Sequence, residues 1–338
     1  MRILIAGLGA IGQRHARNLR ALYGDSLELL ALRRRHLPHV VTDDLQRVDS
    51  RNVEAELDVT VFTSIDEALA ARPEAVFVCT PSSQHLELAQ RAAEAGCHLF
   101  IEKPLSHTLD GVERLRQTVA TKKLVAMVGC QWRYHPCVRW VREVIEAGTL
   151  GTLMEAEIEY GEYLPDWHPY EDYRTSYAAR AELGGGVVLT QIHAYDMAWW
   201  LFGAPRAVTA TGGHLSDLEI DVEDTVDAQL EGGMVPVSVR QSMAMRPPRR
   251  VISVTGEAGS VTVDLLAGRI SSTPRIASAA AFADYQRNQM FVDEARHFQA
   301  CLAGTESPAV PLEDGLEVLR LALAVKTAVR TGRTVEIT

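Results

Sequence analysis

Glycines at a fixed spacing near the start of the sequence are the first residues that could do chemistry. Gly7, Gly9 and Gly12 follow the apolar run RILIA and open a segment with helical spacing. In a strand–turn–helix unit, the first glycine permits a tight turn, the second lets the backbone approach a pyrophosphate, and the third lets helix and strand pack closely. The free N–H groups of the helix start then face the phosphates. We therefore expect a dinucleotide at Gly7, Leu8, Gly9, Ala10, Ile11 and Gly12.

Three arginines follow the second predicted strand, where the adenosine ribose of a dinucleotide is met. An acidic residue there would hold the ribose 2′-hydroxyl of NAD, but the sequence has Arg33, Arg34 and Arg35 and no Asp or Glu near that strand end. Guanidinium groups suit a 2′-phosphate by charge and by their forked donors. We expect NADP(H) to be favoured over NAD(H). A solvated basic turn is the structural alternative.

Two further segments supply candidates for proton transfer. The tripeptide EKP at 102–104 ends a predicted central strand, where open α/β sheets place their sites, and a lysine there could move a substrate proton. Gly184–Gly186 precede a helix that carries His193 and Asp196 one turn apart. His193 is the second candidate for proton transfer. The simpler alternatives are a surface lysine and a core histidine.

A loop dense in aromatic rings with polar tips is the candidate substrate contact. The run YLPDWHPYEDYR occupies residues 163–174. Such side chains suit stacking on, and hydrogen bonding to, a sugar-like ligand. A loop anchored by its own aromatic residues is the alternative. We expect substrate contacts from Tyr163, Trp167, His168, Tyr170 and Arg174.

The elements that must position these residues indicate a Rossmann-type doubly wound fold in the first half. β-rich runs alternate with helical segments, and runs such as AVFVC are apolar on both faces, as a parallel sheet covered by helices on both sides requires. The expected strands are Arg2–Ala6, Leu27–Leu32, Val59–Phe62, Ala75–Cys79, His98–Glu102 and Leu124–Gly129. The expected helices are Ile11–Leu22, Ser64–Ala71, Gln84–Ala95 and Leu109–Thr121.

After a predicted helix over Pro136–Ala147 the pattern changes to strands that alternate in polarity, typical of a mostly antiparallel open sheet. We expect a Rossmann dinucleotide-binding domain at 1–125 and an α+β domain for substrate binding and oligomerisation at 126–338. The last helix, Leu312–Val329, could pack back on the first domain, and Ile270–Ala283 should be the least structured region. The expected strands are Thr152–Tyr160, Ala207–Gly212, Thr225–Leu230, Pro236–Gln241, Val251–Gly256 and Ser260–Leu265, with a hairpin turn at Glu257–Gly259.

Composition limits the partners. A formal net charge of -10 over 338 residues argues against a surface for nucleic acid. No run of about 18 apolar residues predicts a membrane span, and the first residues lack a signal pattern, so we expect a cytoplasmic protein with no membrane partner. The five cysteines are scattered without a C-x-x-C pair, which fits reduced core thiols. Nothing in the sequence predicts a metal site.

Together these segments resemble the Gfo/Idh/MocA dehydrogenases, named for glucose–fructose oxidoreductase and inositol dehydrogenase. The resemblance extends over nearly the whole chain. It covers GLGAIGQRH at 7–15, VCTPSSQH at 78–85, EKP at 102–104, the GGG…H segment at 184–193 and the closing LEDGLEVL…GRTVEI. The combination of EKP with the glycine–histidine segment is the specific part, because GxGxxG alone occurs widely.

The resemblance implies roles for individual residues. In such enzymes the residues matching Lys103 and His193 flank the substrate carbon that faces the nicotinamide, and the proline matching Pro104 is often cis. Relatives usually form dimers or tetramers through the sheet of the second domain, so a homodimer or homotetramer is expected. The cofactor would contact Thr80, Pro81, His85, Glu102, Lys103, Gln131 and Arg133, and the substrate would contact Lys103, Arg133, Gln191 and His193.

One departure from the family pattern bears on the acid–base chemistry. Many members carry an aspartate three or four residues before the histidine, where this sequence has Leu189, Thr190 and Gln191. A threonine cannot act as a carboxylate. The proton relay would therefore run through His193 alone or through Lys103.

Three functions follow from these features. The leading prediction is reversible hydride transfer between NADP(H) and a secondary alcohol or ketone of a sugar, sugar nucleotide or cyclitol. The second is redox-assisted glycoside cleavage or elimination with a retained cofactor. The third is a non-catalytic dinucleotide-binding sensor or scaffold, against which Lys103 and His193 together argue.

Overall fold

A computed structural model describes residues 1–33, 39–49, 52–274 and 282–337, which form two compact units. Unit 1 comprises Met1–Gly129 with Asn288–Leu316, and unit 2 comprises Cys130–Arg287 with Glu317–Thr338. The predicted boundary after residue 125 lies close to the observed one. The segment 288–316 differs from the prediction, because it was expected in the second domain and folds with the first.

Unit 1 is built on a six-stranded parallel sheet, which confirms the predicted doubly wound fold. The strand order is β5-β2-β1-β6-β7-β8, and all neighbours run parallel. The order reverses beside β1, and ligands of open α/β sheets bind outside the carboxyl ends of the strands at such a point. The strands are β1 (Arg2–Ala6), β2 (Glu28–Leu32), β5 (Val59–Phe62), β6 (Ala75–Val78), β7 (His98–Glu102) and β8 (Ala126–Gly129).

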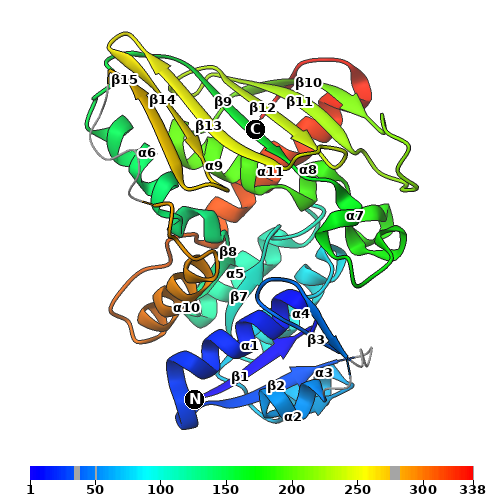
Figure 1. Cartoon of the computed structure of the whole chain (residues 1–338). Coiled ribbons are helices and arrows are strands. Elements are labelled where there is room, and N and C mark those ends of the chain that lie inside the picture. The colour runs from blue at the N-terminus through cyan, green and yellow to red at the C-terminus, as the bar shows by residue number, and fades with distance from the viewer. Residues whose placement is uncertain (34–38, 50–51, 275–281, 338) are drawn as a thin grey trace. The chain divides into compact units, whose positions relative to one another are not determined.

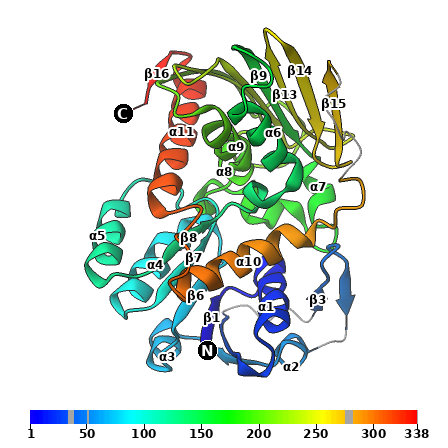
Figure 2. The same ribbon diagram turned by 90° about the vertical axis from the view of Figure 1, so that its left-hand side faces the viewer.

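Helices cover both faces of this sheet. On one face α1 (Ala10–Tyr23) lies beside α10 (Asn288–Leu302), and on the other α4 (His85–Glu94) lies beside α5 (Val112–Lys122) (Figure 2). Two shorter helices, α2 (Val53–Leu57) and α3 (Ile65–Ala70), complete the unit.

Helix α10 was not predicted, and its aromatic residues explain why segment 288–316 belongs to unit 1. The ring of Phe298 packs edge-on against Phe77 and Phe100, with centroid distances of 5.4 and 5.6 Å. Phe77 and Phe100 stack on each other across neighbouring strands at 4.5 Å. Because apolar area removed from water stabilises a fold, this helix completes a core that the first 129 residues begin. Its periodicity alone does not reveal which core it joins.

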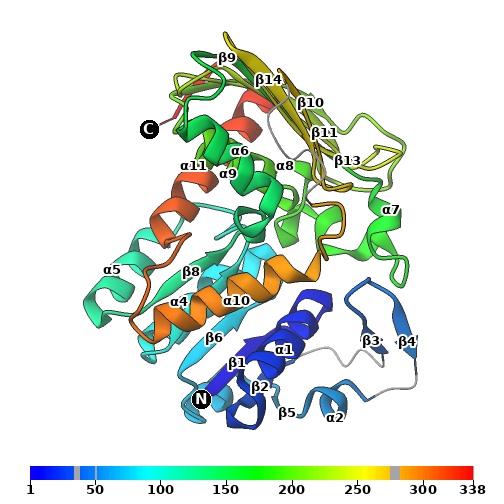
Figure 3. The same ribbon diagram turned by 60° about the vertical axis from the view of Figure 1, so that its left-hand side comes forward.

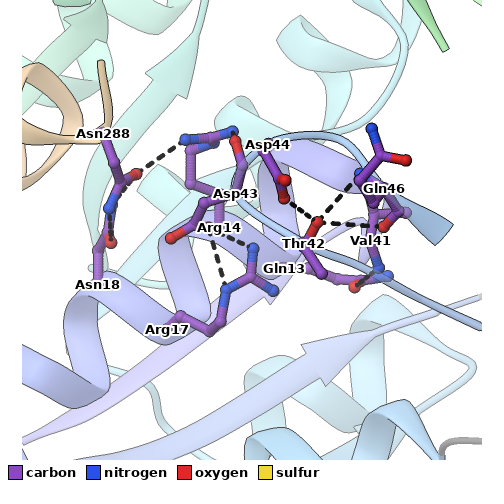
Figure 4. A network of polar contacts seen from close by, with 10 residues as sticks. All are labelled: Gln13, Arg14, Arg17, Asn18, Val41, Thr42, Asp43, Asp44, Gln46 and Asn288. Atoms are coloured by element: carbon purple, nitrogen blue, oxygen red, sulfur yellow. Dashed lines mark hydrogen bonds and ion pairs between the residues drawn. The ribbon is translucent and has the colours of Figure 1, made fainter. Parts of the chain in front are cut away.

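A small hairpin of β3 (His39–Val41) and β4 (Arg47–Asp49) follows β2. Polar side chains of α1 hold both this hairpin and the start of α10 (Figure 4). Their hydrogen bonds join Gln13 to the Val41 N–H (2.8 Å), Arg17 to Asp43 (2.6 Å) and Arg14 to Asn288 (2.8 Å). The helix that follows the glycine loop is therefore fixed on two sides by polar contacts.

Unit 2 is built on an eight-stranded sheet, and the predicted mostly antiparallel arrangement is confirmed. The order is β15-β14-β13-β9-β12-β11-β10-β16, and only β9 and β12 run parallel among these neighbours. The strands are β9 (Leu153–Gly161), β10 (Ala207–Gly213), β11 (Thr225–Glu231), β12 (Val237–Ser242), β13 (Arg249–Gly256), β14 (Gly259–Asp264), β15 (Arg269–Thr273) and β16 (Val335–Glu336).

Two local predictions in this sheet need correction. The hairpin turn between β13 and β14 contains Glu257 and Ala258, because Gly259 already pairs with Gly256. The region 270–283, expected to be the least structured, begins within β15, whose Ile270 is buried and pairs with Val263. The prediction therefore did not recognise a strand in this serine-rich run, although its residues alternate between exposed and buried at the start of β15. Residues 275–281 lie outside the described residues.

The helices of unit 2 lie against one face of its sheet (Figures 1 and 3). They include α6 (Pro136–Glu146), α8 (Val187–Thr190) and α9 (His193–Phe202), while α7 (Leu164–Trp167) is a single turn. The last helix, α11 (Leu312–Thr331), extends two residues beyond its predicted end, and the division between the units falls within it. Among the described helices, none is both long and apolar enough to cross a membrane.

Candidate cofactor and substrate sites

The glycine loop between β1 and α1 has the geometry that a bound dinucleotide requires. Gly7 has a φ of 103°, and a Cβ there would lie 2.7 Å from the Cys79 carbonyl oxygen. A Cβ on Gly12 would lie 1.9 Å from the Gly7 carbonyl oxygen. A Cβ on Gly9 would meet no atom within 4 Å. Two glycines are therefore required by internal packing, whereas Gly9 faces open space at the start of α1, where a pyrophosphate fits.

Thr80, just beyond β6, provides a second sign of a ligand at this edge. Its methyl group lies 3.2 Å from the position of a Cβ on Gly7. Its hydroxyl is buried and has no hydrogen-bond partner in the described part of the chain. A buried hydroxyl without a partner is costly, and a ligand in the glycine loop would supply one. The adjacent Pro81 caps a short 3-10 turn that leads into α4.

His85 connects two of the loops at the carboxyl end of the sheet. Its Nδ1 lies 2.7 Å from the Pro104 carbonyl oxygen, and its Nε2 lies 2.8 Å from the Thr80 carbonyl oxygen. Burial lowers the pKa of His85, although both carbonyls oppose this. The neutral ring therefore donates to one carbonyl at a time. This residue was predicted to bind the cofactor, and in the structure its two ring nitrogens contact the backbone at Thr80 and Pro104.

The EKP segment is held from a second direction by a buried pair. Glu102 Oε1 lies 2.7 Å from His15 Nε2, and Oε2 accepts a hydrogen bond from the Lys103 N–H at 3.3 Å. The peptide bond between Lys103 and Pro104 is cis. Glu102 thus connects helix α1 to the backbone of the candidate catalytic lysine.

Arg33 directly follows β2 and was predicted to contact a 2′-phosphate. It is buried, and its guanidinium pairs with Glu54 of α2 at 2.5 Å. Its positive charge is therefore matched by a carboxylate of the protein itself. Arg34, the other predicted contact for a 2′-phosphate, lies outside the described residues.

His193 is the first residue of α9 in unit 2 and is 4% exposed. The carboxamide nitrogen of Gln131 lies 3.3 Å from His193 Nε2. The rings of Trp132 and Tyr160 lie at centroid distances of 6.5 and 6.2 Å from the imidazole. The Trp132 indole donates to the Tyr160 hydroxyl at 3.2 Å. An amide and two aromatic rings thus surround the imidazole, and Gln131, Trp132, Tyr160 and His193 are called the His193 cluster below.

Arg133 and Asp196 form a buried ion pair between the two elements that carry Gln131 and His193. Arg133 Nε lies 3.1 Å from each carboxylate oxygen, and Nη2 lies 2.6 Å from Oδ1. Their side chains are 3% and 0% exposed. Asp196 is the carboxylate nearest to His193 along the chain, and in the structure this carboxylate binds Arg133. Arg133, predicted to contact cofactor and substrate, joins the 3-10 turn at Gln131–Tyr134 to helix α9.

Thr190 and Gln191, which stand where the family resemblance leads one to expect an aspartate, are hydrogen-bonded to the backbone. The Thr190 hydroxyl donates to the Gly186 carbonyl at 2.7 Å. The Gln191 carboxamide donates to the Ser242 carbonyl at 3.3 Å, and the side chain of Gln241 donates to the Gln191 carbonyl at 2.7 Å. The Gln191 Oε1 is buried without a partner among the described residues, so it keeps an acceptor for a ligand.

The predicted substrate loop at 163–174 directs its charged groups to near neighbours. His168 lies 2.8 Å from Glu171, and Arg174 binds Asp172 at 2.9 Å and Glu219 at 3.3 Å. These contacts do not include His193 or Gln191. The aromatic members are Tyr163, whose ring lies 3.6 Å from the Arg246 guanidinium, Tyr170, whose ring lies 5.3 Å from that of His168, and Trp167, whose buried indole N–H has no partner among the described residues.

Sequence reasoning missed Arg250, which the sheet of unit 2 brings to the His193 cluster. Arg250 of β13 lies with its guanidinium 4.9 Å from the Tyr160 ring centroid and binds Glu162 at 2.5 Å. The strand was predicted to begin at Val251, two residues after its observed start at Arg249. Had the alternation been extended, Arg250 would have stood out as a charged residue at an inward position.

Two models of one protein family match successive parts of the chain. Residues 1–130 match the oxidoreductase family with an NAD-binding Rossmann fold, and residues 138–262 match the GFO/IDH/MocA C-terminal domain. Myo-inositol 2-dehydrogenase from Thermotoga maritima is 27% identical over 100% of this chain and 98% of its own. The NAD⁺-dependent scyllo-inositol 2-dehydrogenase from Bacillus subtilis is 25% identical, over 100% and 96%.

A solved structure shows the same fold. The WlbA dehydrogenase from Bordetella pertussis, in complex with NADH and UDP-GlcNAcA, has a TM-score of 0.82 to this chain at 24% identity. The match covers 100% of this chain and 99% of that one.

Proposed function

The chain belongs to the Gfo/Idh/MocA family of oxidoreductases, and on that premise we propose that it transfers a hydride between NAD(P) and a secondary alcohol or ketone of a sugar, sugar nucleotide or cyclitol. The carrying observation is the carboxyl edge of the unit 1 sheet, where Gly9 leaves space and Thr80 a buried hydroxyl for a dinucleotide. When bound, the nicotinamide supplies the hydride acceptor or donor. The relatives named for inositol oxidation support the substrate class.

Lys103 and His193 are the groups proposed to move the proton. Oxidation of a secondary alcohol releases a proton from oxygen together with the hydride from carbon, so a base must take the proton and return it in the reverse direction. Gln131 holds the Nε2 edge of His193, and Glu102 holds the backbone of Lys103. Because Asp196 is committed to Arg133, the proton passes through His193 or Lys103 rather than through that carboxylate.

The test follows nicotinamide absorbance across sugars, inositols and sugar nucleotides. Lys103→Ala and His193→Ala should each lower turnover by about 10²- to 10⁴-fold, the usual contribution of a positioned acid or base. Cofactor affinity, measured by protein fluorescence, should stay broadly intact. Lys122→Ala and His214→Gln are the surface controls and should match the unsubstituted protein. Full turnover in both site variants would contradict the assignment.

For the cofactor we propose NADP(H), with NAD(H) as the alternative. The support is the sequence at Arg34 and Arg35, where no Asp or Glu stands to hold a ribose hydroxyl. Arg33 does not add to this support, because its guanidinium already pairs with Glu54. Fluorescence titration should show NADPH binding at least about tenfold more tightly than NADH, a difference of about 1.4 kcal/mol. Arg34→Ala should reduce the affinity for NADPH alone. Tighter binding of NADH would overturn the proposal.

We also propose that the chain forms a homodimer or homotetramer through the outer face of the unit 2 sheet. Along β9 the residues Met154, Glu155 and Glu157 are exposed, while Ala156 and Ile158 point to the core. Light scattering at micromolar concentration should report two or four copies, and Met154→Asp should lower that number. A monomer in the unsubstituted protein would contradict it.

A further inference from the structure

Two of the three glycines that precede His193 are required by other groups of the protein itself. A Cβ on Gly185 would lie within 2.8 Å of three backbone carbonyl oxygens. Gly186 has a φ of 97°, and a Cβ there would lie 2.3 Å from Glu223 Oε1. Both glycines are buried. They therefore make room for other parts of the chain, whereas Gly9 of unit 1 faces open space.

Glu223, which stands two residues before β11, holds this glycine turn through two different groups. Its carboxylate fills the position that a side chain on Gly186 would occupy. Its backbone carbonyl accepts the N–H of Val187, the first residue of α8, at 2.8 Å. The first N–H groups of a helix have no partner within the helix, so an acceptor at this point fixes where the helix begins. Glu223 thus holds both the path of the turn and the start of α8.

Lys326 of α11 fixes the carboxylate of Glu223. Its Nζ lies 2.9 Å from each of the two carboxylate oxygens. The side chain of Glu223 is 14% exposed and that of Lys326 is 31% exposed. A carboxylate that has lost most of its hydration needs an opposite charge or hydrogen-bond donors in its place. The ammonium group therefore holds the carboxylate against the glycine turn.

Backbone hydrogen bonds lead from Glu223 to His193 in two short steps. The Val187 carbonyl accepts the Gln191 N–H at 3.0 Å, and the Gln191 carbonyl accepts the Ala194 N–H at 3.1 Å. His193 directly precedes Ala194 and begins α9, so only two residues separate it from the end of α8. A displacement at the start of α8 would therefore move the imidazole within the His193 cluster.

We propose that Glu223 is a positioning residue, which together with Lys326 sets the place of the His193 imidazole for proton transfer. The inference rests on the proposed function, because that function assigns the proton step to His193 or Lys103. Both carboxylate oxygens of Glu223 bind Lys326, so its role is to hold α8 and not to move the proton itself.

A double-mutant cycle tests whether Glu223 acts through His193. The quantity measured is kcat/KM for the substrate with the highest turnover, in Glu223→Gln, His193→Gln and the double variant. Glu223→Gln keeps the size of the side chain and removes its charge, and it should lower kcat/KM about tenfold. In the His193→Gln background the same change should lower it less than about twofold, because the group through which Glu223 acts is already gone.

Two further variants locate the effect in the ion pair. Lys326→Met keeps the aliphatic stem and removes the ammonium group, so it should lower kcat/KM about as much as Glu223→Gln does. Combining the two changes should add little to either one. Glu231→Gln, which changes an exposed carboxylate at the end of β11, is the matched control and should keep the kcat/KM of the unsubstituted protein.

An NMR measurement follows the position of His193 without turnover. In protein labelled at its histidine rings, the His193 signal is the one absent from His193→Gln. This signal should shift in Glu223→Gln and in Lys326→Met, and it should stay in place in Glu231→Gln. Failure of the proposed function is distinguishable, because it would show as a His193 signal that shifts as expected in a protein that turns over no sugar, inositol or sugar nucleotide.

Three results would overturn the proposal. The first is an equal loss of kcat/KM from Glu223→Gln in both backgrounds, which is what a role in stability alone predicts. The second is an unchanged kcat/KM in Glu223→Gln. The third is a His193 signal that does not move when the charge of Glu223 is removed.

Discussion

The two units build their sites by different means. Unit 1 uses its backbone: glycines leave room for a ligand, His85 holds two carbonyl groups, and Glu102 holds the N–H of the candidate lysine. Unit 2 uses side chains from separate elements, with His193 on α9, Tyr160 on β9 and Arg250 on β13. The first site is fixed by shape, and the second by charge and hydrogen bonding.

The two sites should therefore tolerate different amino-acid substitutions. A backbone site that receives an invariant cofactor accepts almost no added atom, because the loop must keep one conformation. A site of converging side chains can change its ligand when one residue changes, while the sheet beneath it stays the same. Stability should therefore be most sensitive to volume in unit 1 and to charge in unit 2.

The largest effect is expected from Gly12→Ala. Its Cβ would lie 1.9 Å from the Gly7 carbonyl oxygen, so the loop or the helix must move. We expect a loss of about 4 kcal/mol or more in the free energy of unfolding. Urea denaturation measures it. Gly9→Ala is the matched control, because its Cβ meets no atom within 4 Å, and it should unfold almost as the unsubstituted protein does. Equal losses in the two variants would contradict the shape argument.

The next effect is expected from Asp196→Ala in unit 2. Removing this carboxylate leaves the Arg133 guanidinium buried without its main partner, which costs about 3 to 5 kcal/mol in comparable pairs. Asp227→Ala removes the partner of Arg240 in an exposed pair and should cost less than about 1 kcal/mol. The same urea curves measure both. If the two variants lost similar stability, charge burial would not distinguish the interior of unit 2 from its surface.

Acid pH should weaken unit 2 through His135. Burial lowers the pKa of His135 to about 4, from an ordinary value of 6.5, and its Nδ1 accepts the Cys137 N–H at the start of α6. Between these values the unfolded chain binds a proton that the folded chain does not, so stability falls as pH drops from 6.5 toward 4. The full loss is about 3 kcal/mol. His135→Asn keeps a capping acceptor and should flatten this dependence in unfolding curves at several pH values. An unchanged slope would count against the assignment.

The smallest effect is expected from Glu102→Gln. Glu102 is a positioning residue, because it binds His15 and the Lys103 N–H. The change should lower kcat about tenfold, or about 1.4 kcal/mol, with KM and melting temperature nearly unchanged. Glu94→Gln on the surface of unit 1 is the control. A parallel fall in melting temperature would make the role structural only.

The fold and the glycine loop of unit 1 could be predicted from the sequence to a large degree. Steric rules require glycine at positions 7 and 12, and apolar runs covered on both faces imply a parallel sheet, so motif and element order agreed. Local spacing could not show that His85 holds two carbonyls, nor that α10 returns to complete the core of unit 1. Both depend on contacts between distant parts of the chain.

The candidate substrate site of unit 2 could be predicted from the sequence only in part. His193 stood out because glycines precede it, but Tyr160 and Arg250 lie on different strands and share no spacing with it. The loop at 163–174 drew attention by its aromatic density, yet Arg174 binds surface carboxylates. The contact between Arg250 and Tyr160 becomes visible only when strands β9 and β13 are paired.

Whether unit 1 binds the cofactor and unit 2 binds the sugar can be tested by measuring both affinities in two variants. Gly9→Ala adds a methyl group in open space, and His193→Gln keeps a polar side chain of similar size. Calorimetry gives the affinity of each variant for NADP⁺ and, with saturating NADP⁺, for the tightest-binding sugar or cyclitol. The account predicts that Gly9→Ala weakens only the binding of the cofactor and His193→Gln only that of the sugar, each by about tenfold or more. It is contradicted if both variants lower the same affinity and leave the other unchanged.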